Sequence, residues 1–227
     1  MMPYLIFMLP AFLLSLFASL YTKSTFAKYA RVPSRQGFTG AQAAAEMLRA
    51  QNIQGVRIER TGGFLSDHYD PRSRTLRLSA DVYQGTSLSA IGVACHEAGH
   101  AIQHARNYGP LALRSTLVPV ASIGSNFSYI LIFLGLLLGS MQLFMVGIAC
   151  FSLAVIFTIV TLPVEWNASA RAKEAMVAGG IVSAQEREGA GAVLNAAFLT
   201  YVAAAVSAVL TLLYYLARAG LLGGRRR

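Results

Sequence analysis

The chain has 227 residues, of which 55% are hydrophobic and only 13% are charged. Soluble globular domains carry about 25% charged residues, so this composition excludes an ordinary soluble domain and favours an integral membrane protein. The net charge of +9 is not accompanied by basic motifs interleaved with aromatic residues, and we therefore expect no nucleic-acid partner.

Three long stretches contain no charged side chain: residues 1–22, 117–163 and 189–217. A helix that crosses a bilayer needs about 20 mostly apolar residues. The first and last stretches can each form one span and the middle stretch two, which predicts four transmembrane helices. Because no polar loop divides the middle stretch, its two helices should meet in a tight turn near Gly139 and Ser140.

The first stretch is predicted to be a retained anchor and not a cleaved signal peptide. No basic residue precedes its apolar core, and it contains no clear small-x-small cleavage site. Basic residues follow it instead, at Lys23, Lys28, Arg31 and Arg35.

The basic residues also predict the orientation, since cytoplasmic flanks are enriched in Lys and Arg. Four spans place segments 23–116 and 164–188 on one side of the membrane and the C-terminal tail on the other. Near the span ends, the shared side carries Lys23, Lys28, Arg31, Arg35, Arg106, Arg114, Arg171 and Lys173. The opposite side carries Arg218, Arg225, Arg226 and Arg227, a competing signal. The larger number favours a cytoplasmic location for the shared side.

The segment after the anchor should form a small α+β unit. "FTGAQAAAEMLRAQN" predicts a helix that is capped by Thr39 and ends before Gly55. The runs "VRIER", "GGFLSDHYDP" and "TLRLS" alternate in polarity and are broken by glycines and Pro71, which predicts two or three strands of an antiparallel sheet.

Two further helices follow from capping and stop signals. "SLSAIGVACHEAGHAIQHARNYG" predicts a helix with Ser87 as N-cap and a stop at Gly109-Pro110. After the middle apolar stretch, Pro163 suits a kink or a restart and Gly179-Gly180 a stop. "SAQE", at residues 183–186, resembles a capping box that opens the last helix.

The segment "HEAGH" carries the chemistry. Helical residues four apart differ by about 40° in direction and about 6 Å along the axis, so His96 and His100 project from one face and can bind one zinc ion. Glu97 points about 100° away from His96, too far to be an easy ligand but within reach of a water on the metal. This is the division of roles in HExxH, with two ligands and a glutamate as general base.

His104 repeats the spacing, but Ala101 stands where a base would be needed after His100. It also lies about 12 Å along the axis from His96, too far for all three histidines to share one ion comfortably. We expect it to be a polar residue at an exposed helix end.

A catalytic zinc needs a third protein ligand and an open position for water. The candidates on the soluble side are Glu46, Glu59, Asp67, His68, Asp70, Asp81, Glu165, Glu174, Glu186 and Glu188. Glu165 is favoured because it follows an even number of spans and so returns to the membrane face of His96. An acid at that depth is costly unless it is paired or bound to a metal. The alternative is an interfacial acid paired with Arg171 or Lys173.

Three segments carry a family resemblance: "HYDPRSRTLRLS", "HEAGHAIQHA" with the following "LRSTLVPVASIGS", and "LPVEWNASARA". They resemble the signatures of the YugP-like neutral zinc metallopeptidases of bacterial membranes and, more distantly, those of HtpX-like and prenyl-endopeptidase gluzincins. The resemblance covers most of the chain from about Thr39 to Ala172. Trp166 stands where Phe is expected, and Ser169 where HtpX-like enzymes carry an Asp behind a ligand.

The resemblance implies one Zn²⁺ held by His96, His100 and Glu165, with Glu97 as catalytic base. It implies an integral protein of the bacterial plasma membrane, with a peptide or membrane-protein substrate and the lipid bilayer as partners. The leading hypothesis is a membrane-anchored zinc metalloendopeptidase. The alternatives are a zinc amidohydrolase that acts on a membrane lipid and a scaffold that zinc only stabilises.

Other residues have weaker signals. His68 or Tyr69 of "SDHYD" could donate a hydrogen bond to the oxyanion, although Asp67 and Asp70 could equally organise a turn there. Gly99, inside a helix, predicts close approach of another backbone, most simply that of a packed transmembrane helix. The strand at residues 75–79 could pair with an extended peptide substrate. Cys95 and Cys150 are interpreted as buried apolar fillers.

The predicted fold class is therefore a mostly α membrane protein with four transmembrane helices and a small α+β zincin-like catalytic domain. The predicted organisation is an anchor (1–22), a catalytic domain with the HExxH helix (23–116), a transmembrane hairpin (117–163), a third-ligand helix (164–188) and a fourth span with a basic tail (189–227). The oligomeric state is not predicted.

Overall fold

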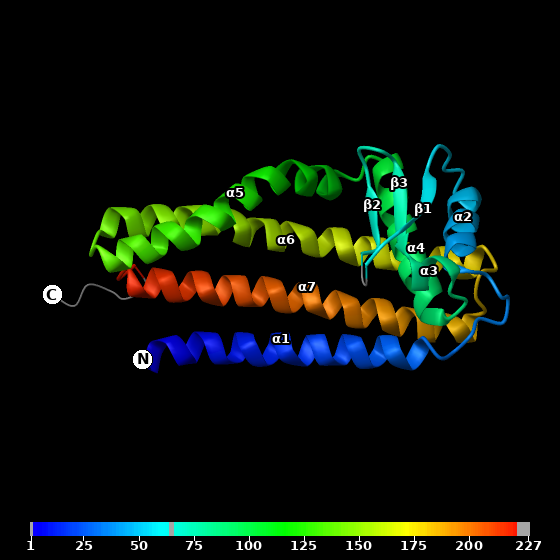
Figure 1. The fold of residues 1–227 in the computed structure, drawn as a ribbon, viewed down its shortest axis with the longest axis horizontal. Coiled ribbons are helices and arrows are strands. Elements are labelled where there is room, and N and C mark those ends of the chain that lie inside the picture. Colours follow the sequence, from blue (N-terminus) through cyan, green and yellow to red (C-terminus); the bar gives the residue numbers. More distant parts are fainter. Residues whose placement is uncertain (1, 64–65, 222–227) are drawn as a thin grey trace.

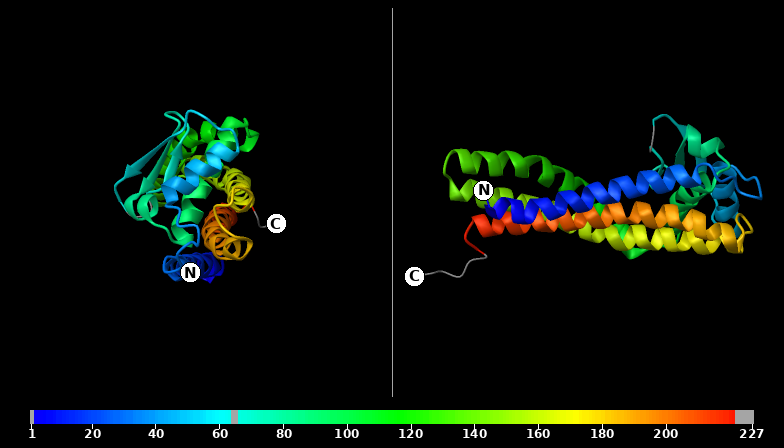
Figure 2. Two further views of the ribbon diagram at one scale, coloured as in Figure 1. Left: turned by 90° about the vertical axis from the view of Figure 1, so that its right-hand side faces the viewer. Right: turned by 90° about the horizontal axis from the view of Figure 1, so that it is seen from below.

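A computed structural model describes residues 2–63 and 66–221, and long helices dominate it (Figure 1). Residues 225–227, which entered the orientation argument, lie outside this range. Four helices are long and apolar enough to cross a membrane: α1 (Met2–Tyr29), α5 (Gly109–Leu137), α6 (Met141–Ala178) and α7 (Ala184–Arg218). The predicted number of spans and the mostly helical class are confirmed. A small α/β layer lies at one end of the long helices (Figures 1 and 2).

The long helices pack as two pairs joined through α6 and α7. α1 runs beside α7, where the Ser15 and Ser207 hydroxyls lie 3.1 Å apart and the Thr22 hydroxyl donates to the Ala196 carbonyl at 2.7 Å. α5 and α6 form the predicted hairpin, and the turn between them contains Gly139 at φ +65°.

Small residues allow the hairpin helices to approach closely. A Cβ on Gly135 would lie 2.5 Å from the Phe144 nitrogen, and one on Gly147 would lie 2.8 Å from the Ile132 nitrogen. Close backbone packing of this kind replaces the hydrophobic driving force that helices lack within lipid. These contacts hold the two helices of the hairpin together. α6 continues from the hairpin into the α/β layer.

The α/β layer contains α2 (Gly40–Ala50), α3 (Ala80–Gln84), α4 (Leu88–Ala105) and the strands β1 (Arg57–Thr61), β2 (His68–Asp70) and β3 (Thr75–Ser79).

The predicted helix caps of this layer and of α7 are present. Thr39 and Gln42 form a capping box on α2, Ser183 and Glu186 form one on α7, and the Ser87 side chain accepts from the backbone N–H of the third residue of α4. These contacts satisfy N–H groups that the first turn of a helix leaves without an intrahelical partner.

Two predicted helix boundaries differ from the structure. α4 ends at Ala105, and Gly109 and Pro110 begin α5 instead of stopping α4, because proline is well tolerated in a first helical turn. α6 continues through Pro163 without a restart and ends at Gly179-Gly180 as predicted. A single helix therefore runs from the hairpin turn into the α/β layer.

The sheet is mixed, so the prediction that all its strands are antiparallel was wrong. Its order is β1-β3-β2, with β1 parallel and β2 antiparallel to β3. The strand richest in buried residues takes the centre, since Leu76 and Leu78 of β3 are fully buried whereas β1 and β2 are partly exposed. β2 and β3 form the local hairpin, and β1 adds to the other side of β3.

This order also corrects the predicted peptide-binding strand. Residues 75–79 form β3, which is paired on both sides and cannot accept a further strand. β2 is an edge strand of the described sheet, and it contacts α4.

α4 is the central helix of the α/β layer. It packs against α2, α6 and α7, and many of its residues are almost completely buried, including Ile91, Cys95 and Ile102. Burial raises the pKa of the Cys95 thiol, which therefore stays protonated. The structure confirms Cys95 as a buried filler, whereas Cys150 on α6 is only half-buried.

The prediction of a close backbone approach at Gly99 is confirmed, and the partner is the membrane-length helix α6. A Cβ on Gly99 would lie 2.7 Å from the Ala168 carbonyl oxygen. The contact brings α4 and α6 together within one turn of His96 and His100 on α4 and of Glu165 on α6.

We predict that Gly99→Ala destabilises the protein, because the added methyl group must push α4 away from α6. Overpacking typically costs about 1–3 kcal/mol, and only part of this is offset by the better helix propensity of alanine. Thermal unfolding in detergent micelles should show a lower Tm. Gly109→Ala is the matched control, since a Cβ at Gly109 meets nothing within 4 Å. Equal melting temperatures for the two variants would contradict the packing argument.

Candidate metal centre

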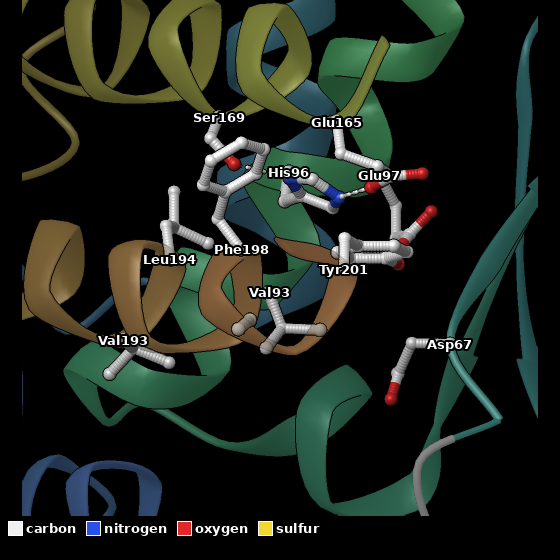
Figure 3. A pocket seen from close by; sticks show the side chains of 11 residues that line it. Asp67, Val93, His96, Glu97, Glu165, Ser169, Val193, Leu194, Phe198 and Tyr201 are labelled. Carbon is white, nitrogen blue, oxygen red and sulfur yellow. Dashed lines mark hydrogen bonds and ion pairs between the residues drawn. The ribbon is translucent and has the colours of Figure 1, made fainter. Parts of the chain in front are cut away.

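Three side chains from two helices converge beside the α/β layer, and Figure 3 shows two of them, His96 and Glu165. His96 and His100 project from one face of α4, as the spacing predicts, and Glu165 projects from α6. Glu165 Oε2 lies 3.1 Å from His96 Nε2 and 3.5 Å from His100 Nε2. One ligand atom from each residue lies within 4.8 Å of the other two, so the cluster could hold a metal ion. Within residues 2–63 and 66–221, no other such group of His, Cys, Asp and Glu is found.

Glu165 is buried, with 1% of its surface exposed, in the helix that emerges from the hairpin. Its charge partners are the two imidazoles and Arg114, whose Nη1 lies 3.5 Å from Glu165 Oε1. The alternative pairing is not observed, because Arg171 bonds to Asn167 and Lys173 to Asn195. The carboxylate is therefore held toward the histidines.

The outer nitrogens of both imidazoles have hydrogen-bond partners. His96 Nδ1 is bonded to the Ser169 hydroxyl at 3.1 Å, and His100 Nδ1 to Gln103 Oε1 at 3.0 Å. Gln103 is itself fixed, since its amide Nε2 donates to the Val164 carbonyl at 2.8 Å. Its Oε1 therefore accepts from His100 Nδ1–H, so Nε2 is the ring nitrogen that faces Glu165 and that would bind a metal ion after losing its proton. Partners of this kind orient histidine ligands in metal sites.

Sequence reasoning singled out Ser169 but missed Gln103 and Arg114. Gln103 could have been noticed, because it is a polar residue three positions after His100 and so lies on the same side of the helix. Arg114 carried no signal beyond its place near a span end, since its approach to Glu165 depends on how α5 packs.

Charge near His100 affects its protonation. Burial lowers the pKa of His100, but the hydrogen bond with Glu165 and the charge of Glu97 outweigh burial and leave the pKa above its usual value. A metal ion at this ring competes with a proton, so binding should tighten as the pH rises.

Glu97 lies beside the cluster and not within it, as its position on the helix predicts. Its Oε2 accepts a hydrogen bond of 3.1 Å from the backbone N–H of Tyr69 in β2. Glu97 also lines two cavities, one of about 170 Å³ between α4 and α7 and one of about 440 Å³ bounded by β2, α4 and α5. The carboxylate is therefore oriented by the sheet and open to both spaces.

The side chains of His68 and Tyr69 have other partners. The Tyr69 hydroxyl bonds to His104 Nδ1 at 2.9 Å, and His68 Nδ1 bonds to the Ser66 carbonyl at 2.7 Å. His104 lies outside the metal cluster as expected, although it pairs with Tyr69 and is only partly exposed. An oxyanion role for His68 or Tyr69 stays a prediction. Tyr201 on α7 is a further hydroxyl, missed by sequence reasoning, which lines both cavities.

The acidic residues near β2 have structural roles. The Asp70 carboxylate accepts from the Ser73 hydroxyl and the Arg72 N–H, and these bonds lower its pKa to about 2. Asp67 accepts from the backbone N–H of Ser79 at 2.7 Å. The two aspartates thus organise the β2–β3 hairpin.

Several other candidate ligands are also occupied elsewhere. Glu46 pairs with Arg49, Glu59 lies near Arg57 and Arg77, and Glu186 belongs to the capping box of α7.

Together, the membrane-length helices and the buried His/Glu cluster define a membrane protein with a possible metal site. The protein-family model described as "Putative neutral zinc metallopeptidase" matches residues 4–220, and the chain belongs to that family. It is 46% identical over 202 residues to the "Putative membrane protease YugP" of Bacillus subtilis (strain 168), an alignment that covers 89% of this chain and 90% of that protein. No solved structure matches the chain.

We predict that Ser169→Ala weakens zinc binding about 10- to 100-fold, because His96 loses the hydroxyl that orients its ring. The dissociation constant can be measured by competition with a zinc-binding dye in micelles. Ser152→Ala is the control, since the Ser152 hydroxyl only donates to the Ile148 carbonyl of its own helix. If both variants bind zinc as tightly as the wild type, Ser169 does not support the metal site.

Proposed function

We propose that the protein is a membrane-anchored zinc metalloendopeptidase. His96, His100 and Glu165 would hold one Zn²⁺, and Glu97 would act as the general base. The observation that carries this proposal is the convergence of two imidazole Nε2 atoms on one buried carboxylate oxygen, with Glu97 alongside. Membership of a zinc metallopeptidase family supports the choice of metal.

The donor set fits zinc. Zinc prefers nitrogen, oxygen and thiolate ligands, and catalytic sites use three protein groups with one position left for water. Two imidazoles and a carboxylate meet this requirement, and Ser169 and Gln103 orient the imidazoles from behind. Cys95 precedes His96 but lies in the core as a protonated thiol, so it does not compete as a ligand.

A zinc ion held by His96, His100 and Glu165 would supply Lewis-acid chemistry, which polarises a carbonyl and makes water more acidic. Glu97 takes a proton from the attacking water and passes it to the leaving amine. The Tyr69 N–H holds Glu97 at the junction of the two cavities, where both water and the scissile amide can reach it. Arg114 pairs with Glu165 Oε1 and leaves Oε2 facing the histidines.

The substrate is proposed to be a peptide or a membrane protein. β2 is an edge strand that passes beside Glu97, so an extended peptide can pair with it and place an amide bond near the site. The printed name of the Bacillus subtilis relative, a membrane protease, is consistent with this class.

The protein is proposed to lie in the bacterial plasma membrane with its active site on the cytoplasmic side. The start of α5, the end of α6 and the start of α7 all lie at the end of the molecule that carries the α/β layer (Figure 1). These ends carry Arg114, Arg171 and Lys173 and, with Lys23 and Lys28 of α1, give this side the excess of basic residues that marks a cytoplasmic flank.

We predict that Glu97→Gln retains zinc but loses at least 10²- to 10⁴-fold in turnover, because the amide cannot take a proton. The amide oxygen can still accept from Tyr69 N–H, so the fold should be preserved. Zinc content and cleavage of a peptide library are measured on the same micellar preparation. Undiminished peptide cleavage by this variant would overturn the mechanism. Release of lipid fragments in place of peptides, by the wild type only, would instead support a zinc amidohydrolase.

We predict that Glu165→Ala loses stoichiometric zinc after dialysis, because two imidazoles alone hold the ion weakly. Glu174→Ala is the matched control, since Glu174 is exposed on the same helix. Metal analysis of the two variants beside the wild type gives the comparison. Full zinc occupancy in Glu165→Ala would show that the third ligand is a different residue.

A further inference from the structure

The cavity between α4 and α7 has one polar end and one apolar end (Figure 3). His96, Glu97 and Glu165 form the polar end. The apolar end is formed by Val93 on α4 and by Val193, Leu194, Ala197 and Phe198 on α7, and the lining is completed by the polar residues Asp67, Ser169 and Tyr201. The apolar space therefore adjoins the residues proposed to carry the chemistry, which is where a substrate side chain next to the scissile bond would lie.

The cavity follows from how the two helices meet. α4 and α7 pack closely at Gly92, where a Cβ would lie 3.3 Å from the Ala190 carbonyl oxygen. The lining residues of α7 follow Ala190 at helical spacings of three and four, so they continue the face that points to α4. One turn beyond the Gly92–Ala190 contact, the facing sides of α4 and α7 line the cavity.

The cavity has the size of one large apolar side chain. Its volume is about 170 Å³. An engineered apolar cavity of about 150 Å³ stays dry and binds benzene, so this space can accept the side chain of Leu or Phe. A charged side chain would be desolvated there without a partner at the apolar end.

The cavity also lies level with two polar contacts of α7. Thr22, the last residue before Lys23 on α1, bonds to Ala196, and Lys173 of α6 bonds to Asn195. α7 itself carries no charged residue from Gly189 to Ala217, so these contacts mark the level at which charged residues of the neighbouring helices α1 and α6 lie beside it. Ala197 and Phe198 directly follow the two contact residues.

Trp166 marks the same level. It follows Glu165 in the sequence, is 54% exposed, and its ring centroid lies 5.2 Å from that of Phe198. Lys173 Nζ lies 5.4 Å from the same indole ring. Exposed tryptophan beside lysine is typical of the membrane–water interface.

We infer that this cavity is a specificity pocket, which receives a large apolar side chain next to the scissile bond at the membrane–water interface. The inference rests on the proposed peptidase function and names its substrate class: polypeptides that present Leu or Phe at the end of a membrane span. Specificity from a pocket of this type amounts to about 10- to 100-fold in kcat/KM between Leu and Ala.

The first experiment uses the zinc-loaded full chain in micelles and peptides that differ at one residue, Leu, Phe, Ala or Asp, with cut sites mapped by mass spectrometry. At one position flanking the cut, Leu and Phe should exceed Ala about 10- to 100-fold, and Asp should not be accepted. Equal rates for Leu and Asp at both flanking positions would overturn the inference while leaving the peptidase function intact. Absence of any cleavage would overturn the proposed function and this inference with it.

Variants that fill the cavity test its lining directly. Ala197→Phe, and the smaller change Ala197→Leu, should reduce kcat/KM for the Leu peptide about 10-fold or more and for the Ala peptide less than about 3-fold, with zinc content unchanged. Val206→Phe is the control, since Val206 is exposed on α7 away from the cavity. If both Ala197 variants retain the wild-type preference for Leu, the cavity is not the pocket.

Binding can be measured without turnover. Trp166 is the only tryptophan in the sequence and contacts the lining residue Phe198, so its fluorescence reports on the pocket. In Glu97→Gln, the Leu peptide should change the fluorescence with a Kd about 10-fold below that of the Ala peptide. Addition of Ala197→Phe should remove this difference; a difference that persists in the double variant would overturn the assignment.

The interfacial position is tested with single-span reporter proteins in liposomes. A reporter with a Leu at the end of its span should be cleaved next to that residue. A reporter in which the Leu lies about ten residues further into the water-soluble part should be cleaved at least 10-fold more slowly. Equal cleavage of the two reporters would overturn the interfacial part of the inference.

Discussion

The structure depends on one buried carboxylate that lies between two imidazoles. Glu165 would be costly at this depth without compensation, because a charge removed from water needs a partner of opposite charge or a metal ion. The compensation comes from α4 on one side and from Arg114 of α5 on the other. This interaction therefore joins the membrane hairpin to the α/β layer. It depends on the close approach of α4 and α6 at Gly99 and Ala168.

Periodicity and capping were sufficient to predict most of the helices. Uncharged stretches revealed the four membrane-length helices because lipid tolerates little charge, and Thr39, Ser87 and Ser183 marked helix starts because their side chains satisfy backbone N–H groups. The spacing of His96 and His100 predicted their common face, since a single helix determines it.

Features that depend on tertiary packing were not predictable in the same way. β1 pairs in parallel with β3 although β2 lies between them in the sequence, whereas the alternating runs had suggested an antiparallel sheet. The cluster was anticipated at Glu165 by counting membrane crossings, but Arg114 and Tyr201 were missed because their positions depend on how different helices pack. The sequence of a single helix does not determine the distances between side chains on different helices.

The continuity of α6 has a consequence for biosynthesis. The imidazoles are synthesised before the hairpin and the carboxylate within its second helix, so the cluster cannot form until α6 has been made and has packed on α4. A nascent chain, or one whose hairpin fails to insert, would lack the complete cluster. The order of segments along the chain thus ties the formation of the cluster to assembly of the molecule in its bilayer.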